Sequence, residues 1–492
     1  MLGPGNRLTI YLPFRATERA KCDSGRLNRH AHSFTARRAF DPTDAAQDPW
    51  QRDFIDQEPL KRIPHLQHLP NFKAKRRTRA AAATDLRAGQ PASYTTAMKS
   101  IELFAGAGGL ALATANAGFH HRAVLEWNPN ACATLRKNKA DGLRQLRGAK
   151  IIEGDISSVD FSEYTDKVDL VSGGPPCQPF SIGGKHAGMD DSRNMFPHAI
   201  RAVREIAPKA FLFENVKGLL RGSFSQYYQY IIHQLSFPEL QRRGDEEWTD
   251  HLVRLEKAAT KGVSSGLKYN VIYQLFDAAN FGVPQHRHRV LIVGIRSDLN
   301  LEFSFPTKTH EEDGLLHDMW VTGSYWDRHK IPSRKRPATP NHLKKRISDL
   351  RCLFPGMLLP AWRTVRDAIA DLPEVTPGKS CERFPNHFCN PGAKSYAGHT
   401  GSPYDEPSKA LKAGDHGVPG GENTLRFDDG SVRYFTVREC ARIQTFPDDW
   451  IFQGSWTESM RQLGNAVPVQ MCEVVAKDLH RLIAQNKATV HG

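Results

Sequence analysis

A strand, a glycine turn and a helix follow one another in the stretch Ile101-Glu-Leu-Phe104-Ala-Gly106-Ala-Gly108-Gly109-Leu. Glycines let the backbone approach a ligand closely, and the N-terminus of a helix favours an electron-rich group. Met98 stands shortly before this stretch and is a natural beginning for a domain. The pattern predicts the first strand of an α/β sheet whose first turn binds a ligand.

Short apolar runs alternate with helical patterns from residue 98 to about residue 300. Strands are expected at residues 101–104, 123–126, 150–152, 168–172, 210–214, 271–276 and 289–294. Helices are expected between several of them, at residues 110–117, 129–138 and 195–206. Strands that alternate with helices predict an α/β fold with a doubly wound, mostly parallel sheet, in which ligands bind beyond the carboxyl ends of the strands.

The next two strand ends carry groups that suit an adenosine-containing ligand. Glu126 ends the second strand, where a carboxylate can accept hydrogen bonds from both ribose hydroxyls, and Trp127 can cover a face of adenine. Asp155, beside Ile156 at the third strand end, can accept a hydrogen bond from the adenine amino group. These residues do not separate NAD from S-adenosylmethionine, and a purely structural turn is the alternative.

Cys177 follows the fourth strand in the turn Gly173-Gly-Pro-Pro176-Cys177-Gln178. A free cysteine is usually a small buried hydrophobe, which is what we expect of Cys132, Cys440 and Cys472. A Gly/Pro-rich turn at the ligand-binding rim suits an exposed, reactive thiol instead. Cys177 is therefore the predicted nucleophile.

Glu214 and an arginine pair stand beside other strand ends. Glu214 ends an apolar strand, and Arg287 and Arg289 lead into another strand with the period of two that places both on one side. A structural salt bridge is the alternative for such a set. Beside a reactive cysteine, the three residues predict acid catalysis by Glu214 and orientation of an anion by the arginines.

The charge of the chain indicates a polyanionic partner, of which nucleic acid is the usual one. The 492 residues carry a net charge of +14, with a pI of about 9.4. No run approaches the roughly 18 apolar residues that span a bilayer. Arg7, Arg15 and Arg19 interrupt the N-terminus, so no signal peptide is expected. These features predict an intracellular, cytoplasmic protein without membrane contact.

The segments outside the predicted sheet differ in composition. Residues 1–97 carry 17 basic and 9 acidic residues, a net charge of +8, without a sustained period, which predicts a disordered basic extension or a misassigned start. Residues 301–430 are rich in Pro, Gly, His and Arg, and Asp327–Arg346 holds eight basic residues against one acid. They predict a smaller irregular domain with a basic face, or else a solvated insertion. A final amphipathic helix is expected from the spacing of Met471, Val475, Leu479 and Ile483.

The eight cysteines are scattered along the chain, unlike the dense framework of a small secreted domain. Cys381, His387 and Cys389 lie close together, but their spacing is unusual for a metal site and no fourth ligand is evident. We therefore expect no bound metal.

Together these motifs resemble those of the DNA (cytosine-5) methyltransferases of bacterial restriction–modification systems. The glycine turn resembles the first motif of that family, and Pro175-Pro176-Cys177-Gln178 resembles its catalytic loop. The later family motifs follow in order, as Glu214-Asn215-Val, Gln285-x-Arg287-x-Arg289, Thr436–Asp448 and Gln462–Pro468. The resemblance covers residues 98 to about 486 and leaves 1–97 outside. It departs from the family at Glu102, where Asp is common, and in the His at both variable positions of Gln-x-Arg-x-Arg.

The resemblance implies a Rossmann-like catalytic domain at residues 98–300, a target-recognition domain at 301–430, and a C-terminal segment at 431–492 that returns to the catalytic domain. It implies S-adenosylmethionine as methyl donor and double-stranded DNA as substrate. Cys177 is expected to attack carbon 6 of a flipped-out cytosine while Glu214 assists at N3. Arg289, together with Arg287, is expected to orient the base and Glu214 by donating to oxygen atoms. The expected cofactor-binding residues are Phe104, Gly106, Gly108, Glu126, Trp127, Asp155, Ile156, Pro176, Asn465 and Val467. The expected DNA contacts are Gln178, Ser181 and Arg193.

Three other functions stay open on the sequence. Methylation of RNA cytosine belongs to one branch of the family, although the large variable domain favours DNA. An NAD-dependent oxidoreductase would leave Cys177, Glu214 and the arginine pair unexplained, and a DNA-binding protein with a vestigial catalytic fold would not need them. A monomer that protects DNA against a paired restriction endonuclease, without a stable complex between the two, is expected; the sequence does not reveal the DNA site.

Overall fold

The computed structural model describes residues 97–176, 194–261, 266–353, 356–376, 379, 381–395, 400–413 and 423–490. The predicted N-terminal extension lies outside these residues except for Ala97. Residues Pro91–Gly492 belong to one compact unit. Among the described residues, no helix combines the length and the apolar character that crossing a membrane would require.

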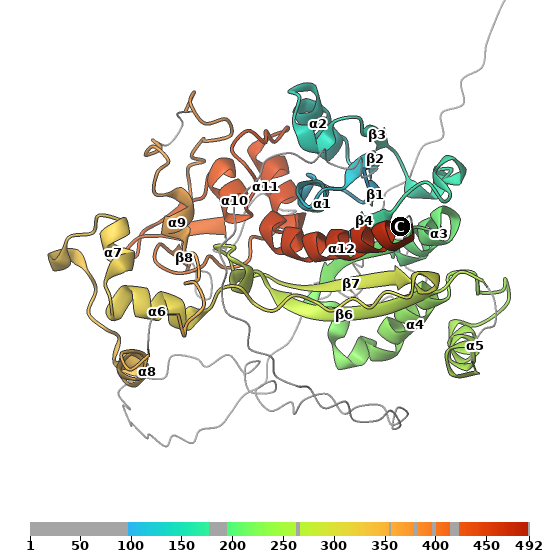
Figure 1. Cartoon of the computed structure of the whole chain (residues 1–492). Helices are drawn as coiled ribbons and strands as arrows, with labels where there is room; N and C mark the ends of the chain where they lie inside the picture. Colours follow the sequence, from blue (N-terminus) through green and yellow to red (C-terminus); the bar gives the residue numbers. More distant parts are fainter. Residues whose placement is uncertain are drawn as a thin grey trace, which may run out of the picture. The chain divides into compact units, whose positions relative to one another are not determined.

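A seven-stranded sheet forms the centre of the described structure (Figure 1). Its strand order is β3-β2-β1-β4-β5-β7-β6. The first five strands are parallel, whereas β7 runs antiparallel to both of its neighbours. The strands are β1 (Lys99–Leu103), β2 (His120–Glu126), β3 (Lys150–Glu153), β4 (Leu170–Gly173), β5 (Ala210–Val216), β6 (Tyr269–Asp277) and β7 (His288–Arg296). The predicted α/β fold with a doubly wound, mostly parallel sheet is confirmed.

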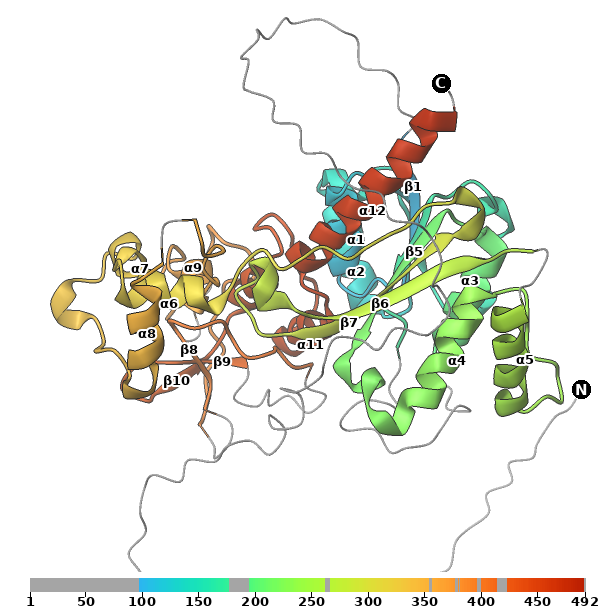
Figure 2. The same cartoon turned by 60° about the horizontal axis from the view of Figure 1, so that its bottom comes forward.

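Two layers of helices cover the sheet because side chains alternate between the faces of each strand. On one face, α1 (Gly109–Asn116) packs against α12 (Val469–Val490), and α2 (Pro129–Ala140) adds Leu135 to the same core. On the other face lie α3 (Phe196–Ile206) and α4 (Ser225–Ser236), with α5 (Trp248–Lys261) against α4 (Figure 2).

The C-terminal helix α12 confirms the predicted amphipathic pattern. Met471, Val475, Leu479 and Ile483 are all buried in the core that α12 shares with α1. Burying apolar side chains of this size stabilises the fold by roughly 1.5–3 kcal/mol each. The C-terminal helix α12 therefore helps to cover one face of the sheet that contains β1.

A second region follows β7 and has a small core of its own, formed by Leu315, Met319, Tyr325 and Trp326. Its helices are α6 (Glu312–Trp320), α7 (Ser324–Arg328), α8 (Lys344–Leu350) and α9 (Val365–Ile369). Its sheet has the order β10-β9-β8 and consists of β8 (Ser402–Pro403), β9 (Thr424–Arg426) and β10 (Val432–Tyr434). The chain then returns to the main core through α10 (Val437–Ile443) and α11 (Trp456–Asn465).

Short 3-10 helices connect these elements. They are η1 (Arg144–Leu146), η2 (Ile156–Ser158), η3 (Ser162–Tyr164), η5 (Lys217–Leu220), η6 (Gly222–Phe224), η7 (Ala278–Phe281), η8 (Ser297–Leu299), η9 (Ser333–Lys335) and η10 (Asn341–Leu343).

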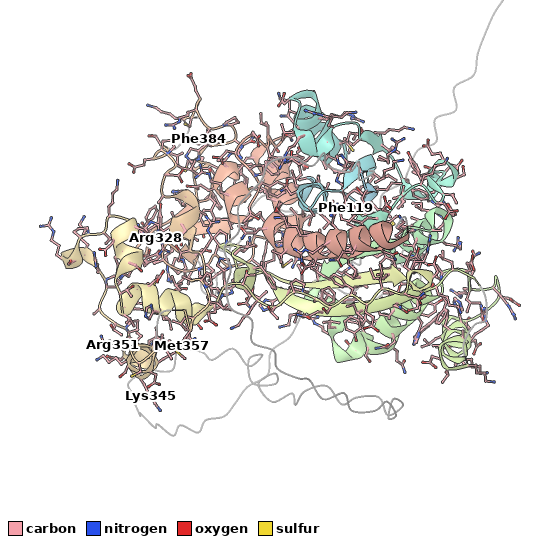
Figure 3. All side chains as sticks on the ribbon, viewed as in Figure 1. Phe119, Arg328, Lys345, Arg351, Met357 and Phe384 are labelled. Atoms are coloured by element: carbon pink, nitrogen blue, oxygen red, sulfur yellow. The ribbon has the colours of Figure 1, made fainter. Side chains whose placement is uncertain are left out.

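The basic charge expected on the second region is partly neutralised by ion pairs. Arg346 pairs with Glu312 and Asp313, which lie outside the basic stretch read from the sequence. Lys345 and Arg351 are exposed at α8, away from the seven-stranded sheet (Figure 3). Fewer unpaired cations are therefore available to bind a polyanion than the eight basic residues of Asp327–Arg346 suggest.

Candidate active site

The turn after β1 is built around left-handed backbone. Phe104, Gly106 and Gly108 have φ angles of 54°, 53° and 92°, and α1 begins directly after them. A side chain at Gly108 would also meet the ring of Trp450, since an added Cβ would lie 2.8 Å from it. The left-handed φ of Phe104 is uncommon for a residue with a Cβ, and such strained backbone clusters at ligand sites. The turn thus has the form of a backbone cradle.

Glu126 lies at the end of the adjacent strand β2 and is hydrogen-bonded to the turn after β1. Its Oε2 accepts a hydrogen bond from the Gly106 backbone nitrogen at 2.6 Å, and its Oε1 accepts from those of Trp127 and Asn128 at 3.0 and 2.8 Å. The residue is only 8% exposed. Each carboxylate oxygen can accept more than one hydrogen bond, so lone pairs of Glu126 remain available to ribose hydroxyls.

The third strand end adds Asp155 to the same edge of the sheet. Glu126 and Glu153 are partners in the parallel register of β2 and β3, and the backbone nitrogen of Gly154 donates to the carbonyl oxygen of Glu126. These contacts hold β3 beside β2. Asp155 is exposed, and its hydrogen bond from the backbone nitrogen of Ser157 lowers its pKa. Trp127 is 73% exposed, so its ring is free to cover a flat ligand. These groups fit an adenosine moiety.

The C-terminal segment reaches the cradle from the other end of the chain. An added Cβ at Gly109 would lie 2.5 Å from the carbonyl oxygen of Val467, so the start of α1 and this segment are in close backbone contact. Val467 is buried, whereas Asn465 at the end of α11 is exposed. Val467 therefore lies beside the start of α1, where the sequence predicts that the cofactor binds.

The predicted nucleophile Cys177 lies outside the described residues, as do Gln178, Ser181 and Arg193. The backbone on both sides of residues 177–193 is described. Met195 nitrogen donates to the carbonyl oxygen of Pro176 at 3.0 Å, and Asn215 Nδ2 donates to that of Pro175 at 2.9 Å. The Pro-Pro turn is thus tied to β5 directly before Cys177.

Glu214 lies against this turn. An added Cβ at Gly174 would be 3.1 Å from Glu214 Oε2, and Arg289 Nε is 2.5 Å from Oε1 in an ion pair. Burial raises the pKa of Glu214, while the positive charges of Arg289 and Arg287 act in the opposite direction. An acid whose pKa is raised by burial holds its proton to higher pH, which suits a general acid.

The two arginines of the predicted pair have different contacts. Arg289 pairs with Glu214, as the motif predicted. Arg287 is only 2% exposed and donates instead to the carbonyl oxygens of Leu411 and Gly464, at 2.8 and 2.5 Å. Its charge is close enough to lower the pKa of Glu214, although no hydrogen bond between the two is recorded.

One buried carboxyl beside the site was noticed in the sequence only as a departure from the family pattern. Glu102 is 1% exposed and accepts a hydrogen bond from Ser172 Oγ on the neighbouring strand. Burial raises the pKa of Glu102 to about 8, and no described residue bonds to its Oε1. An acidic residue inside an otherwise apolar strand is the sequence signal that marks it.

The three cysteines that were predicted to be buried are buried. Cys132, Cys440 and Cys472 are free and buried. Burial raises the pKa of each thiol, that of Cys132 to about 12. Thiols of this kind are poor nucleophiles because little thiolate forms at neutral pH.

The cluster at Cys381, His387 and Cys389 does not form a metal site in the described part of the chain. Both ring nitrogens of His387 already have partners, Thr436 Oγ1 and the carbonyl oxygen of Pro373, each at 2.9 Å. Its imidazole therefore serves to join segments of the second region.

Comparison with known proteins gives consistent matches over most of the chain. A family model described as C-5 cytosine-specific DNA methylase matches residues 98–238 and 254–481. The chain is 33% identical over 387 residues to Type II methyltransferase M.Eco47II of Escherichia coli, covering 78% of this chain and 79% of that protein. It is 33% identical over 387 residues to M.PspPI of Psychrobacter sp., with the same coverage. It is 32% identical over 385 residues to M.NgoMIV of Neisseria gonorrhoeae, covering 77% of this chain and 96% of that protein.

Proposed function

Because this chain belongs to the C-5 cytosine-specific DNA methylase family, we propose that it methylates cytosine within a specific double-stranded DNA sequence through a covalent adduct of Cys177. Its DNA (cytosine-5) methyltransferase activity follows from the family. The roles of individual residues are our proposal. The observation that carries them is the buried Glu214–Arg289 pair, which lies against Gly174 three residues before Cys177.

The residues at the first three strand ends fit S-adenosylmethionine, the methyl donor that the family implies. Glu126 would hold the ribose, Trp127 and Ile156 would flank the adenine, and Asp155 would accept from its amino group. Phe104, Gly106, Gly108, Pro176, Asn465 and Val467 would line the remaining pocket. When bound, this group supplies an activated methyl on a sulfonium sulfur.

Carbon 5 of cytosine is a weak nucleophile, so the protein first has to change the ring. The Cys177 thiolate would form a bond to carbon 6, while Glu214 donates a hydrogen bond or proton at N3 and Arg289 holds Glu214 in place. The resulting enamine has an electron-rich carbon 5 that accepts the methyl group. Methyl transfer would leave the donor as the thioether S-adenosylhomocysteine. A water molecule would then take the proton from carbon 5 as the Cys177 thiolate leaves carbon 6, and N3 would return its proton to Glu214, which restores the aromatic ring.

This chemistry requires the cytosine to leave the duplex, because a thiolate has to approach the face of the ring. Flipping one base out costs a few kcal/mol. Gln178, Ser181 and Arg193 are proposed to contact the DNA around that base. Residues 301–430 are proposed to read the sequence, with exposed cations such as Lys345 holding phosphates.

The deciding experiment uses DNA that contains 5-fluorocytosine. Fluorine cannot leave as a cation, so the protein, the methyl donor and this DNA should accumulate a covalent complex that survives denaturing electrophoresis. Cys177→Ala should form none. A complex that persists in Cys177→Ala, or none with any DNA tested, would overturn the proposed mechanism.

The relatives named Type II methyltransferases support a role in restriction–modification. The chain would protect DNA against an endonuclease that acts on the same site, without a stable complex between them. We propose that it works as a monomer in the bacterial cytoplasm. Bisulfite sequencing of DNA from expressing cells should reveal one recurrent methylated sequence, and light scattering should give the monomer mass. Scattered methylation, or a stable dimer, would contradict these two points.

A further inference from the structure

Arg287 is a buried cation whose charge is stabilised by two distant backbone segments. Its Nη1 donates to the carbonyl oxygen of Leu411 at 2.8 Å and its Nη2 to that of Gly464 at 2.5 Å. A buried guanidinium is costly unless it is hydrogen-bonded. The two prongs of its planar fork therefore join the segment around residue 411 to the end of α11.

The segment 408–411 is also bonded to the residues just before Arg287. Ser408 nitrogen donates to the Pro284 carbonyl at 2.9 Å, and His286 nitrogen donates to that of Ser408 at 2.8 Å. Leu411 nitrogen donates to Gln285 Oε1 at 3.2 Å. The segment thus lies alongside residues 284–287 like a short added strand.

The end of α11 touches the same segment without room for a side chain. A Cβ added at Gly464 would overlap the backbone at Lys412 and Ala413. Lys412 is held in turn by Asn423, which accepts from its nitrogen at 3.0 Å and donates to its carbonyl at 2.9 Å. Three residues beyond Gly464, Val467 meets Gly109 in the cofactor turn. Packing is therefore continuous from that turn to residues 408–413.

We propose that Arg287 is a positioning residue for target DNA: it fixes residues 408–413, within the target-recognition region, to the segment that closes the cofactor site. Arg289 pairs with Glu214, whereas the guanidinium of Arg287 donates to two backbone carbonyls. This inference rests on the proposed function. It assigns different roles to the two arginines of one motif: Arg289 acts in the reaction through Glu214, and Arg287 positions the DNA.

Arg287→Lys tests this role because it keeps the positive charge near Glu214 but loses the two-pronged contact. With DNA carrying the site found by bisulfite sequencing, KM for DNA should rise about tenfold while kcat changes less than about threefold. The pH profile of kcat should stay in place. Arg296→Lys is the matched control, since Arg287 directly precedes β7 whereas Arg296 ends it and donates to the Ala207 carbonyl. It should leave both constants unchanged.

A second variant covers the case in which Arg287→Lys does not fold. Gly464→Ala inserts a methyl group between α11 and residues 412–413 and should give the same rise in KM. If Arg287→Lys lowers kcat about a hundredfold at saturating DNA, or if either folded variant leaves KM unchanged, the inference is overturned. A wild-type protein that forms no adduct with 5-fluorocytosine DNA would instead sink the proposed function itself.

Discussion

Glu214 and Arg289 form a pair in which burial and charge act in opposite directions on one proton. Burial raises the pKa of Glu214, and the adjacent guanidinium keeps that rise in check. Under the proposed mechanism, the raised pKa of Glu214 would favour donation from this carboxyl toward a ring nitrogen.

Glu214→Gln should lower kcat for methyl transfer by about 100- to 10,000-fold, because glutamine fills the same volume but cannot transfer a proton. KM for DNA should change little. Single-turnover methylation at saturating DNA measures this directly. Glu205→Gln, which alters a carboxylate paired with Arg201 on α3, should keep the wild-type rate. If kcat of Glu214→Gln falls by less than tenfold, Glu214 is not the general acid.

Glu102→Gln should change how stability depends on pH. Burial in the folded protein raises the pKa of Glu102 from its ordinary value of 4.5 to about 8. The stability that this proton contributes is complete below pH 4.5 and is lost as pH rises toward 8. Between pH 5 and 8 the wild type should therefore lose on the order of 3 kcal/mol relative to the variant. Urea denaturation of both proteins at several pH values measures this, and a constant difference between them would contradict it.

Single residues could be predicted where a local motif defines them. The pairing of Glu214 with Arg289 follows from two motifs at neighbouring strand ends. The partners of Arg287 could not be predicted, since they are backbone carbonyls of Leu411 and Gly464, brought in by tertiary folding. Every residue has a backbone carbonyl, so the sequence does not indicate which carbonyl accepts a given hydrogen bond.

At the scale of elements, the start of α1 is tightly constrained. It carries the left-handed turn, and Gly109 meets the backbone of Val467. Helix N-termini attract electron-rich groups, so displacement of this end should act first on the cofactor.

Gly109→Ala should weaken binding of S-adenosylhomocysteine about tenfold, because the added methyl group has to push away the carbonyl oxygen of Val467. Isothermal titration calorimetry measures this. Gly222→Ala is the control, since a Cβ there has no atom within 4 Å. Equal affinity in Gly109→Ala and wild type would mean that the contact is not part of the cofactor site.

The sequence predicted all seven strands of the main sheet because apolar runs and helical periods are local signals. It did not predict that β7 runs antiparallel, since an apolar run has no direction. Nor did it predict β8, β9 and β10, whose two or three residues are too few to show a period.

At the scale of the whole molecule, the described fold begins at the residue where the family model begins matching. Met98 is buried and Lys99 starts β1, so removing residues 1–97 leaves all seven described strands of the main sheet in the chain. The removed part nevertheless carries a net charge of +8.

A chain that starts at Met98 should keep kcat within about twofold of the full chain. Its KM for DNA should depend less steeply on salt, because fewer cations release counterions on binding. Methylation rates measured between about 50 and 200 mM salt test both points. A loss of kcat at saturating DNA would show that the fold or the site needs residues 1–97.

The contact between Gly109 and Val467 also has a consequence for how the enzyme is made. The ribosome makes the turn after β1 long before it makes Trp450, Val467 and the helix α12, which pack against that turn and against α1. Contacts this far apart in sequence form late and slow folding. A nascent chain should therefore carry an open turn and an uncovered sheet face until residues 450–490 have been made. Methylation would begin only after that segment has joined the fold.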